Sequence, residues 1–343
     1  MSEAIAPNPV VTAAIDSLCE GVDLDSSTSG EVLAEVMGGR VNESQTAGFL
    51  IALRAKGETA SEVAGLASTM RSLATRVEPS SSPLVDTAGT GGGASTFNVS
   101  TTAALIAAGA GVHMAKHGNR SATSQSGSAD VLEALGVRID LGPDQIAKAI
   151  DEIGFGFMFA PGHHSATRFV VPVRMGLGTR TVFNILGPLT NPAGATRQVV
   201  GVGDPTKVEV MAEALAQLGT EKALVIHSED GLDEISIAAP TRLRQVVDGT
   251  LSELTVSPSD FGVSEASLES VRGGTPDENA ATTRAVLAGQ QGAPRDLSVM
   301  NAAAAIYVGT ESEDLLECAD RARTAIDDGS ALKVLQELQG FGG

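Results

Sequence analysis

The sequence predicts an α/β protein with a small N-terminal all-helical domain and a large α/β domain whose central sheet is mainly parallel. The first 80 residues contain only helical patterns, and a Pro/Ser-rich segment follows at 78–83. Beyond it, strand-like runs alternate with helical ones. We therefore divide the chain into residues 1–80 and 81–343, and we expect helices within about 165–190 to complete the helical domain.

Helix-start signals recur in the first 80 residues. Residues 9–20 carry apolar side chains at helical spacing. The segments TSGE (28–31) and TASE (59–62) fit the capping-box pattern, and NESQ (42–45) is a close variant. These signals predict a succession of helices.

After residue 80 the pattern becomes strand, loop and helix. The strand-like runs are LVD (84–86), GVHMAKHG (111–118), RQVVGVG (197–203) and KALVIHS (222–228). A helix is expected from Pro205 to Gly219, and the tail from Asn301 is expected to be helical. Strands that alternate with helices are typical of a largely parallel sheet.

Charge and composition disfavour several functions. The formal net charge is −19, no long Lys/Arg stripe offsets it, and the chain has no Trp, so nucleic-acid binding is not expected. Cys19 and Cys318 form neither a metal spacing nor a disulfide framework. No apolar run approaches the roughly 20 residues of a membrane span, and no signal-peptide pattern is present. We expect a cytoplasmic protein that binds neither nucleic acid nor membranes.

A glycine-rich loop lies in DTAGTGGGASTFNVST (86–101), where Gly91–Gly93 are consecutive and a helical run follows. Bare backbone before a helix lets a ligand approach main-chain N–H groups, and that ligand is usually a phosphate. The dinucleotide-binding reading fails because no acidic residue follows roughly 20 residues on, and the Walker reading fails because no Lys-Ser/Thr follows the glycines. A generic anion loop remains, with a structural turn equally consistent. Residues 98–101 add side-chain donors and a helix N-cap.

A second polar cluster, KHGNRSATSQSGSAD (116–130), follows the strand-like run that ends near Gly118. Ligands of open α/β sheets bind at the carboxyl ends of strands. Its Lys, Arg, Asn, Ser and Thr donors suit a phosphate or pyrophosphate, with a polar surface loop as the alternative.

A third cluster, HSEDGLDEIS (227–236), places the adjacent carboxylates Asp233 and Glu234 after a strand. Hard oxygen ligands without His or Cys suit Mg²⁺, which keeps waters and bridges substrate phosphates. A solvated acidic loop fits the same pattern.

Histidines and arginines gather in a fourth segment, residues 162–192. Among them, an Arg could clamp a carboxylate through two parallel hydrogen bonds. Surface arginines on a helix are an equal alternative for any one of them. NILGPLTNP (184–192) is interpreted as a turned loop with no assigned chemistry.

With these clusters in view, the chain resembles the anthranilate phosphoribosyltransferase family over nearly its whole length. The segments that carry the resemblance are FLIALRAKGET (49–59), NVST (98–101), KHGNR (116–120), SGSADVLEALG (126–136), FNILGPLTNPA (183–193), GLDE (231–234) and NAAAAI (301–306). The resemblance implies a homodimer, formed through the helical domain, of nucleoside phosphorylase class II-like fold with its active site in a cleft. It implies transfer of phosphoribose from 5-phosphoribosyl 1-pyrophosphate to anthranilate, an early step of tryptophan biosynthesis.

Site residues follow from the resemblance position by position. The donor site is implied to comprise Gly89, Gly92, Gly93, Thr96, Asn98, Val99, Ser100, Thr101, Lys116, His117, Gly118, Asn119, Arg120, Ser121, Ala122, Thr123, Ser124 and Ser128. Anthranilate is implied to meet Gly89, Asn119 and Arg174, with His117 and His164 along its approach. Two magnesium ions per subunit are implied at Ser100, Asp233 and Glu234, and Lys116, Asp233 and Glu234 form the implied catalytic set.

The glycine loop departs from the family pattern GTGGDGxxTFN. GTGGGASTFN (89–98) is one residue shorter and has no Asp, so Gly93 stands where the family keeps a carboxylate or just after it. The other site motifs are intact.

Two other functions are compatible with this fold. A pyrimidine nucleoside phosphorylase would use inorganic phosphate without paired magnesium ligands, and GLDE and KHGNR argue against it. A non-catalytic relative that binds nucleic acid conflicts with the net charge of −19 and the intact acidic pair.

Overall fold

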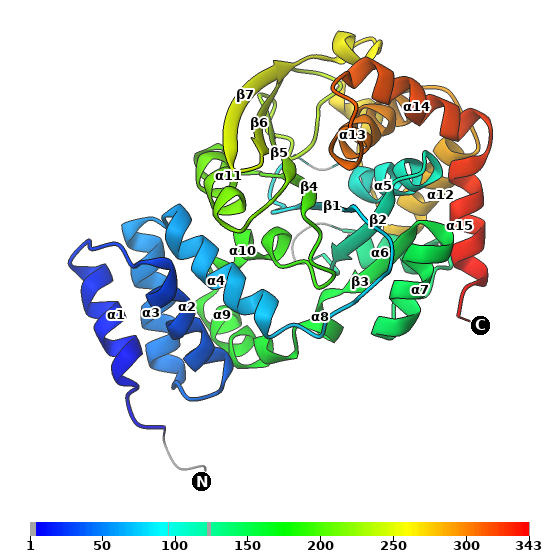
Figure 1. The fold of residues 1–343 in the computed structure, drawn as a ribbon. Helices are drawn as coiled ribbons and strands as arrows, with labels where there is room; N and C mark the ends of the chain where they lie inside the picture. Colours follow the sequence, from blue (N-terminus) through cyan, green and yellow to red (C-terminus); the bar gives the residue numbers. More distant parts are fainter. Residues whose placement is uncertain (1–4, 95, 122–124, 343) are drawn as a thin grey trace.

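A bundle of N-terminal helices joins a larger unit built around one seven-stranded sheet in the computed structural model, which describes residues 5–94, 96–121 and 125–342 (Figure 1). The bundle consists of α1 (Pro9–Cys19), α2 (Ser26–Met37), α3 (Glu43–Lys56) and α4 (Ala60–Ser72). The first strand begins at Leu84, beyond the Pro/Ser-rich segment. The division at residue 80 stays a prediction.

Polar caps fix where the bundle helices begin. The predicted capping box of α4 is confirmed, because Thr59 Oγ1 accepts a hydrogen bond from Glu62 N and Glu62 Oε2 accepts one from Thr59 N. Asn42 caps α3 as expected. The capping box predicted at residues 28–31 is wrong, since the Asp25 carboxylate accepts from Thr28 N and starts α2 three residues earlier.

The sheet contains seven strands among the described residues. They are β1 (Leu84–Gly89), β2 (His113–Gly118), β3 (Phe155–Phe159), β4 (Arg197–Gly201), β5 (Lys222–Ser228), β6 (Thr241–Val247) and β7 (Thr250–Val256). Their order is β3-β2-β1-β4-β5-β6-β7, and the first five are parallel whereas β6 and β7 are antiparallel. The prediction of a mainly parallel sheet is confirmed.

Three strands were not predicted from the sequence. β3 is a short apolar run that periodicity alone cannot assign to a strand. β6 and β7 form a hairpin across Asp248-Gly249, whose φ values of 45° and 79° suit a two-residue turn. An Asp-Gly pair between two alternating runs is a strong hairpin signal that could have revealed them.

Helices and short 3₁₀ turns connect the strands. They are α5 (Val99–Gly109), α6 (Ser128–Ala134), α7 (Pro143–Ile153), α8 (Ala160–His163), η1 (Ser165–Phe169), α9 (Val171–Leu177), α10 (Phe183–Leu186), η2 (Gly187–Leu189), η3 (Pro205–Lys207), α11 (Val208–Gln217), η4 (Pro258–Phe261), η5 (Leu268–Val271), α12 (Pro276–Leu287), α13 (Ala293–Gly309), α14 (Leu315–Asp327) and α15 (Ser330–Gly340). The helix expected from Pro205 begins as η3, and the helical tail begins before Asn301, within α13.

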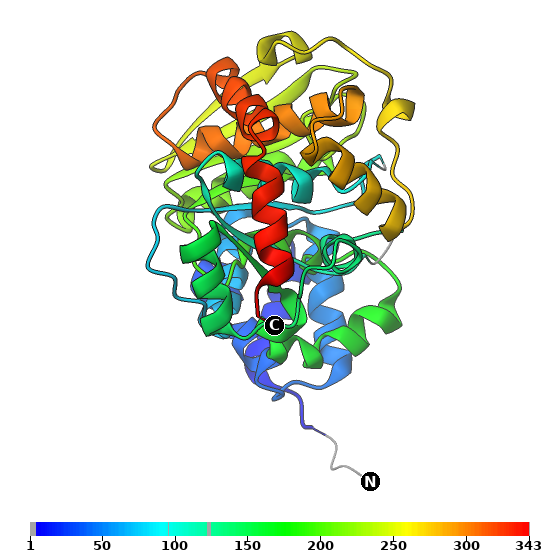
Figure 2. The same ribbon diagram turned by 90° about the vertical axis from the view of Figure 1, so that its right-hand side faces the viewer.

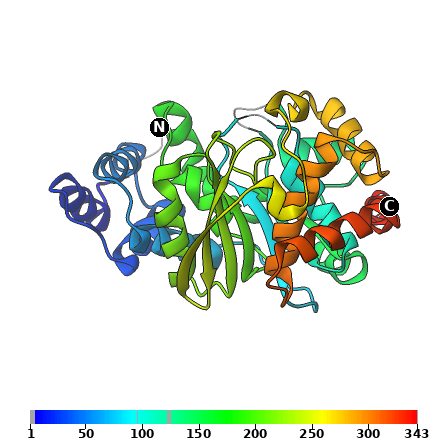
Figure 3. The same cartoon turned by 90° about the horizontal axis from the view of Figure 1, so that it is seen from above.

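Helices cover both faces of the sheet. On β5, Leu224 and Ile226 join the core with α5 and α13, whereas Ala223 and Val225 join the core with α4 and α11. Figure 3 shows the sheet between the N-terminal bundle and the C-terminal helices, and Figure 2 shows α15 crossing in front of the sheet. α9 contacts α3 and η1 contacts α2, and the assignment of helices within about 165–190 to the bundle stays a prediction.

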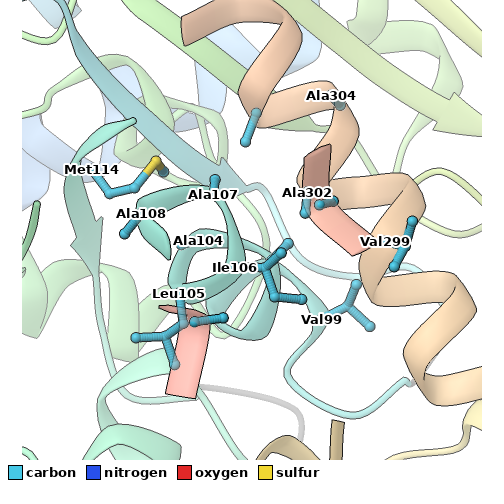
Figure 4. Packing of buried hydrophobic residues seen from close by; sticks show 14 of the residues in the cluster. Val99, Ala104, Leu105, Ile106, Ala107, Ala108, Met114, Val299, Ala302 and Ala304 are labelled. Atoms are coloured by element: carbon cyan, nitrogen blue, oxygen red, sulfur yellow. The ribbon is translucent and has the colours of Figure 1, made fainter. Parts of the chain in front are cut away.

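Small side chains bring α5 and α13 close together. Ala104 and Ala107 on α5 and Ala302 and Ala304 on α13 are wholly buried in one cluster (Figure 4). Close packing of this kind leaves few voids and holds an element rigidly. It therefore fixes the first turn of α5, which follows the glycine-rich loop.

No helix in the described ranges combines the length and the apolar character that crossing a bilayer requires.

We predict that Gly65→Ala destabilises the protein by about 1–3 kcal/mol through overpacking. A Cβ at Gly65 in α4 would overlap the carbonyl oxygen of Ser26 on α2, which cannot move aside cheaply. Gly48→Ala in α3 is the control, because its Cβ would meet only Ile15 Cδ1, at 3.3 Å. Urea unfolding measures both variants, and equal losses would refute close packing at Gly65.

Candidate active site

Four parallel strands end at one edge of the sheet, and the predicted chemistry lies on the loops that leave it. β1 ends at Gly89, β2 at Gly118, β4 at Gly201 and β5 at Ser228. The glycine-rich loop, the polar 119–127 loop and the acidic loop that carries Asp233 and Glu234 leave β1, β2 and β5 in turn. Ligands of open α/β sheets bind at this edge.

The glycine-rich loop adopts a backbone that requires glycine. Gly91 and Gly92 have φ values of 64° and 88°, which side-chain-bearing residues rarely adopt. Gly93 lacks room instead, because its Cβ would lie 2.7 Å from the Gly231 carbonyl oxygen and 3.0 Å from Asp233 N. The third consecutive glycine is therefore explained by close contact with the acidic loop.

The acidic loop lies directly on the strand ends. A Cβ at Gly201 would overlap the Asp233 carbonyl oxygen, and one at Gly89 would lie 2.8 Å from Asp233 Oδ2. Gly91 N donates a hydrogen bond to Asp233 Oδ2 at 3.2 Å. The predicted anion loop and the predicted metal ligand are thus in direct contact, although 142 residues separate Gly91 from Asp233.

Asp233 and Glu234 are half-buried rather than solvated. Burial raises the pKa of both carboxyl groups, and for Glu234 the charge of Asp233 adds to it, so that the pKa reaches about 8. Thr96 Oγ1 donates to Glu234 Oε2 at 2.8 Å. Within the described part of the chain no Lys or Arg forms an ion pair with either carboxylate. Nearby cations therefore act on the pair only at longer range, through Arg180 on Asp233 and Lys116 on Glu234.

This donor set fits magnesium. Both ligating groups are carboxylates, and their raised pKa values reflect negative charge that a divalent cation would offset. No cluster of three or more His, Cys, Asp and Glu residues that could hold a metal occurs among the described residues. Mg²⁺ needs no such cage, because it binds through one or two carboxylates and takes its other ligands from water and phosphate.

Lys116 lies buried on β2 beneath the acidic loop. Its Nζ donates to the carbonyl oxygen of Thr87, and to Thr87 Oγ1 at 3.1 Å, and lies 3.5 Å from Ser100 Oγ. Burial lowers the pKa of Lys116 to about 8, although the charges of Asp86 and Glu234 oppose the shift. The amine is therefore mostly protonated at pH 7, and its pKa lies about one pH unit above that value.

The sequence analysis missed a buried network under Lys116. Asp86 Oδ1 accepts from His117 N at 3.0 Å, and Asp86 Oδ2 accepts from Asn191 Nδ2 at 2.8 Å. Asn191 Nδ2 also donates to the Ala115 carbonyl oxygen at 2.7 Å. The network ties β1, β2 and the NILGPLTNP segment together. An acidic residue inside an apolar strand was the signal that could have found it.

His117 and His164 face each other with ring centroids 5.1 Å apart. Both are buried, and His164 Nε2 bonds to the Thr190 carbonyl oxygen at 3.1 Å. Burial is the main cause that lowers the pKa of His117 to about 3 and of His164 to about 4. Both rings are therefore neutral at pH 7, and they lie tilted by 59° to each other.

The loop after β2 folds back onto α6. Asp130 Oδ2 accepts from Ser121 N at 3.1 Å and from Gly127 N at 2.8 Å, which shapes the turn. The Arg120 guanidinium forms ion pairs with Asp130 and Glu133. Ser128 Oγ donates to the Asn119 carbonyl oxygen at 3.3 Å. The predicted Ala122, Thr123 and Ser124 lie outside the described residues.

The remaining predicted residues lie at the start of α5 or on α9. Asn98 precedes α5 but does not cap it as expected, because its Oδ1 accepts from Ser126 Oγ and from Asn279 Nδ2. Val99 and Thr101 have buried side chains, so only their main chain could contact a ligand. Arg174 lies half-buried on α9, with its guanidinium 5.4 Å from the Phe183 ring centroid. In the described residues no hydrogen bond joins Arg174 to Gly89 or Asn119.

Comparison with known families covers nearly the whole chain. Residues 81–332 match the model of the glycosyl transferase family a/b domain, and residues 12–74 match that of the glycosyl transferase family helical bundle domain. The chain is 48% identical over 330 residues to an anthranilate phosphoribosyltransferase of Symbiobacterium thermophilum, covering 96% of this chain and 97% of the relative. It is 47% identical to the enzyme of that name from Desulfatibacillum aliphaticivorans, covering 95% and 97%.

Solved structures agree with the sequence relatives. The anthranilate phosphoribosyltransferase of Thermus thermophilus aligns with a TM-score of 0.89 at 41% identity, covering 96% of this chain and 98% of that one. The enzyme of that name from Saccharomyces cerevisiae, solved in complex with 5-phosphoribosyl 1-pyrophosphate and Mg, aligns with a TM-score of 0.88 at 26% identity, covering 96% and 97%. The yeast enzyme solved with 4-fluoroanthranilate aligns with a TM-score of 0.86 at 26% identity, covering the same shares.

We predict that His164→Gln gains stability relative to the native protein as the pH falls. The unfolded imidazole binds a proton below about pH 6.5, whereas the pKa of folded His164 is about 4. The native protein therefore loses stability through this window, by at most about 1.4 kcal/mol per pH unit for one group, and the variant does not. Urea unfolding at pH 7.5 and 5.0 measures the difference in unfolding free energy. A difference that stays constant with pH would contradict a neutral, buried His164.

Proposed function

Because the chain belongs to the anthranilate phosphoribosyltransferase family, we infer that it transfers the phosphoribosyl group of 5-phosphoribosyl 1-pyrophosphate to the amine of anthranilate in tryptophan biosynthesis. The products are N-(5-phosphoribosyl)anthranilate and pyrophosphate. We propose that the reaction occurs at the carboxyl edge of the sheet. The observation that carries this proposal is the contact between the loop of Gly91–Gly93 and the acidic loop of Asp233 and Glu234.

We propose that the donor lies across the two polar loops and the start of α5. The residues proposed to hold it are Gly89, Gly92, Gly93, Thr96, Asn98, Val99, Ser100, Thr101, Lys116, His117, Gly118, Asn119, Arg120, Ser121 and Ser128. Main-chain N–H groups at a helix N-terminus favour anions. Gly91 and Gly92 are exposed and carry no side chains of their own, which leaves their main chain open to a ligand.

Asp233, Glu234 and Ser100 would hold magnesium, and we propose two ions per subunit. When bound, the metal neutralises charge on the diphosphate as it leaves. The proposal is supported by two electrostatically coupled carboxylates that form no ion pair with any described Lys or Arg. A bound cation would also lower the pKa of Glu234 and favour its ionised form at neutral pH.

Lys116 is proposed to stabilise negative charge that develops beside it. Bond breaking at C1 of the ribose leaves positive charge on the sugar and negative charge on the departing diphosphate. The Lys116 ammonium is held by Thr87, in a buried position where a charge acts strongly. Its pKa of about 8 keeps the charged form dominant at pH 7.

For the acceptor, we propose binding by Gly89, Asn119 and Arg174, with His117 and His164 along its approach. The neutral imidazoles offer an aromatic surface for the ring, and a guanidinium can hold the carboxylate through two parallel hydrogen bonds. The aromatic amine is already uncharged near pH 7. Positioning, rather than a strong general base, therefore governs its attack.

We further propose a cytoplasmic homodimer formed through the helical bundle. Ile51 on α3, Phe169 on η1, and Val171 and Met175 on α9 are exposed large apolar side chains, and Met175 is 77% exposed. α9 packs against both α3 and η1, so these side chains come from adjoining elements. Exposed apolar side chains on adjoining elements are typical of an interface. Cys19 and Cys318 are both free thiols, which suits a reducing compartment.

Turnover of anthranilate tests the function directly. The protein is mixed with anthranilate, 5-phosphoribosyl 1-pyrophosphate and Mg²⁺, and the loss of anthranilate fluorescence is followed. The chain contains no Trp, so its own emission interferes little. No loss of fluorescence that depends on both the enzyme and the donor would overturn the assignment.

We predict that Asp233→Asn combined with Glu234→Gln lowers turnover by about two or more orders of magnitude, because charge stabilisation of the leaving group is lost. The same change should raise or preserve the melting temperature, since burial and mutual repulsion disfavour the two charges in the folded state. Glu229→Gln, exposed on the same loop, is the control. Near-normal turnover of the folded double variant would rule out the metal role.

Arg174→Ala is predicted to raise KM for anthranilate strongly and to leave KM for the donor nearly unchanged, because only the acceptor carries the carboxylate it would hold. Arg174→Lys should restore little, since an ammonium cannot replace the planar guanidinium. Arg168→Ala serves as the control, because Arg168 stacks on Phe169 and not on the acceptor site. Equal changes in both KM values would show that Arg174 does not recognise the acceptor.

A further inference from the structure

Arg180 reaches the glycine-rich loop from the opposite side of the edge. Arg180 lies on the connection between α9 and α10, two helices that contact the N-terminal bundle. A Cβ at Gly92 would overlap Nη1 of Arg180, so the guanidinium lies directly over that residue. Nη2 donates to the Gly91 carbonyl oxygen at 3.5 Å, the long limit of a hydrogen bond.

The Arg180 guanidinium forms no ion pair with any residue that the structure describes. Arg40, Arg120, Arg138, Arg242 and Arg272 are arginines with solvent-accessible side chains that each pair with a carboxylate. Arg180 is exposed too, yet no carboxylate oxygen in the described ranges lies within 4.0 Å of its guanidinium. Arg54, Arg76, Arg168 and Arg284 are also exposed without an ion pair in the described residues, so what distinguishes Arg180 is its position over Gly92.

Its charge nevertheless acts on the active site. Hydrogen bonds from Thr206 are the main cause that lowers the pKa of Asp204, which follows β4, and the Arg180 charge adds to them. Burial raises the pKa of Asp233, and the Arg180 charge opposes that shift. The guanidinium therefore lies near both the glycine-rich loop and a proposed metal ligand.

The backbone of Arg180 is anchored while its side chain is not. Arg54 on α3 donates from Nη1 to the Arg180 carbonyl oxygen at 2.8 Å and also bonds to Thr179 Oγ1. Thr181 N donates to Asn184 Oδ1 at 2.9 Å on the other side. The bundle therefore holds the base of the side chain in place and leaves the guanidinium free to change its partner.

We propose that Arg180 is a donor-binding residue whose guanidinium contacts the diphosphate of 5-phosphoribosyl 1-pyrophosphate over Gly91–Gly93. This rests on the active site proposed above. On donor binding, phosphate oxygens replace the weak contact with the Gly91 carbonyl oxygen. The planar guanidinium matches the geometry of phosphate oxygens, and its charge opposes the negative charge of the diphosphate. The contact also joins the N-terminal bundle to the donor through Arg54.

The test compares Arg180→Ala and Arg180→Lys with the native enzyme in two measurements. The first is KM for each substrate, and the second is the Kd of inorganic pyrophosphate with Mg²⁺ by calorimetry, which needs no turnover. We expect Arg180→Ala to raise the donor KM and the pyrophosphate Kd about 10- to 100-fold, in keeping with loss of hydrogen bonds between charged groups. KM for anthranilate should stay within about twofold, and Arg180→Lys should recover part of the loss. Arg168→Ala, which removes an arginine from the same region, should change none of the three.

Each other result overturns the proposal. Unchanged donor KM and pyrophosphate Kd in Arg180→Ala would show that the guanidinium does not contact the diphosphate. A larger effect on anthranilate would assign Arg180 to the acceptor. Both comparisons require that the native protein turns over its substrates. A native protein that neither turns over nor binds pyrophosphate would refute the proposed function together with this inference.

Discussion

The site depends on the close approach of the acidic loop to the ends of β1 and β4. Gly89 and Gly201 carry no Cβ, so Asp233 lies against both strand ends, and Gly93 meets the Gly231 carbonyl oxygen from the other loop. Any side chain at Gly201 would displace the main chain of Asp233. Packed interiors yield little, so such a displacement would move the carboxylates away from the glycine-rich loop. The rigid sheet and the α5–α13 contact set the positions from which the two loops meet.

The edge of the sheet is electrostatically unbalanced without a ligand. Burial raises the pKa of Glu234 to about 8 and lowers that of Lys116 to about 8, so both charges are costly at pH 7. Across the described residues, the Asp233 carboxylate accepts from Gly91 N without an ion pair, and Arg180 donates only over a long distance to a carbonyl oxygen. In the complex we propose, substrate diphosphate and magnesium would supply opposite charges to these groups. We therefore propose that the unbalanced charge at the edge contributes to donor recognition.

The sequence allowed the mainly parallel sheet, the glycine-rich loop and the acidic pair to be predicted, because each follows from local residue types. It did not reveal the Asp86–Asn191 network, since those residues are 105 positions apart and their contact depends on strand order. The position of Arg180 over Gly92 likewise depends on how the bundle meets the sheet. The capping error at Thr28 was local: two acceptable caps lay close together, and Asp25 starts the helix.

A crystal structure with 5-phosphoribosyl 1-pyrophosphate and Mg²⁺ tests the central claim most directly. The claim is that the glycine-rich loop binds diphosphate while the acidic loop binds the metal. The expected complex places the diphosphate on the Gly91–Gly93 amides and frees Asp233 Oδ2 from Gly91 N to ligate Mg²⁺. A complex in which Asp233 keeps that hydrogen bond while the diphosphate lies elsewhere would contradict the claim.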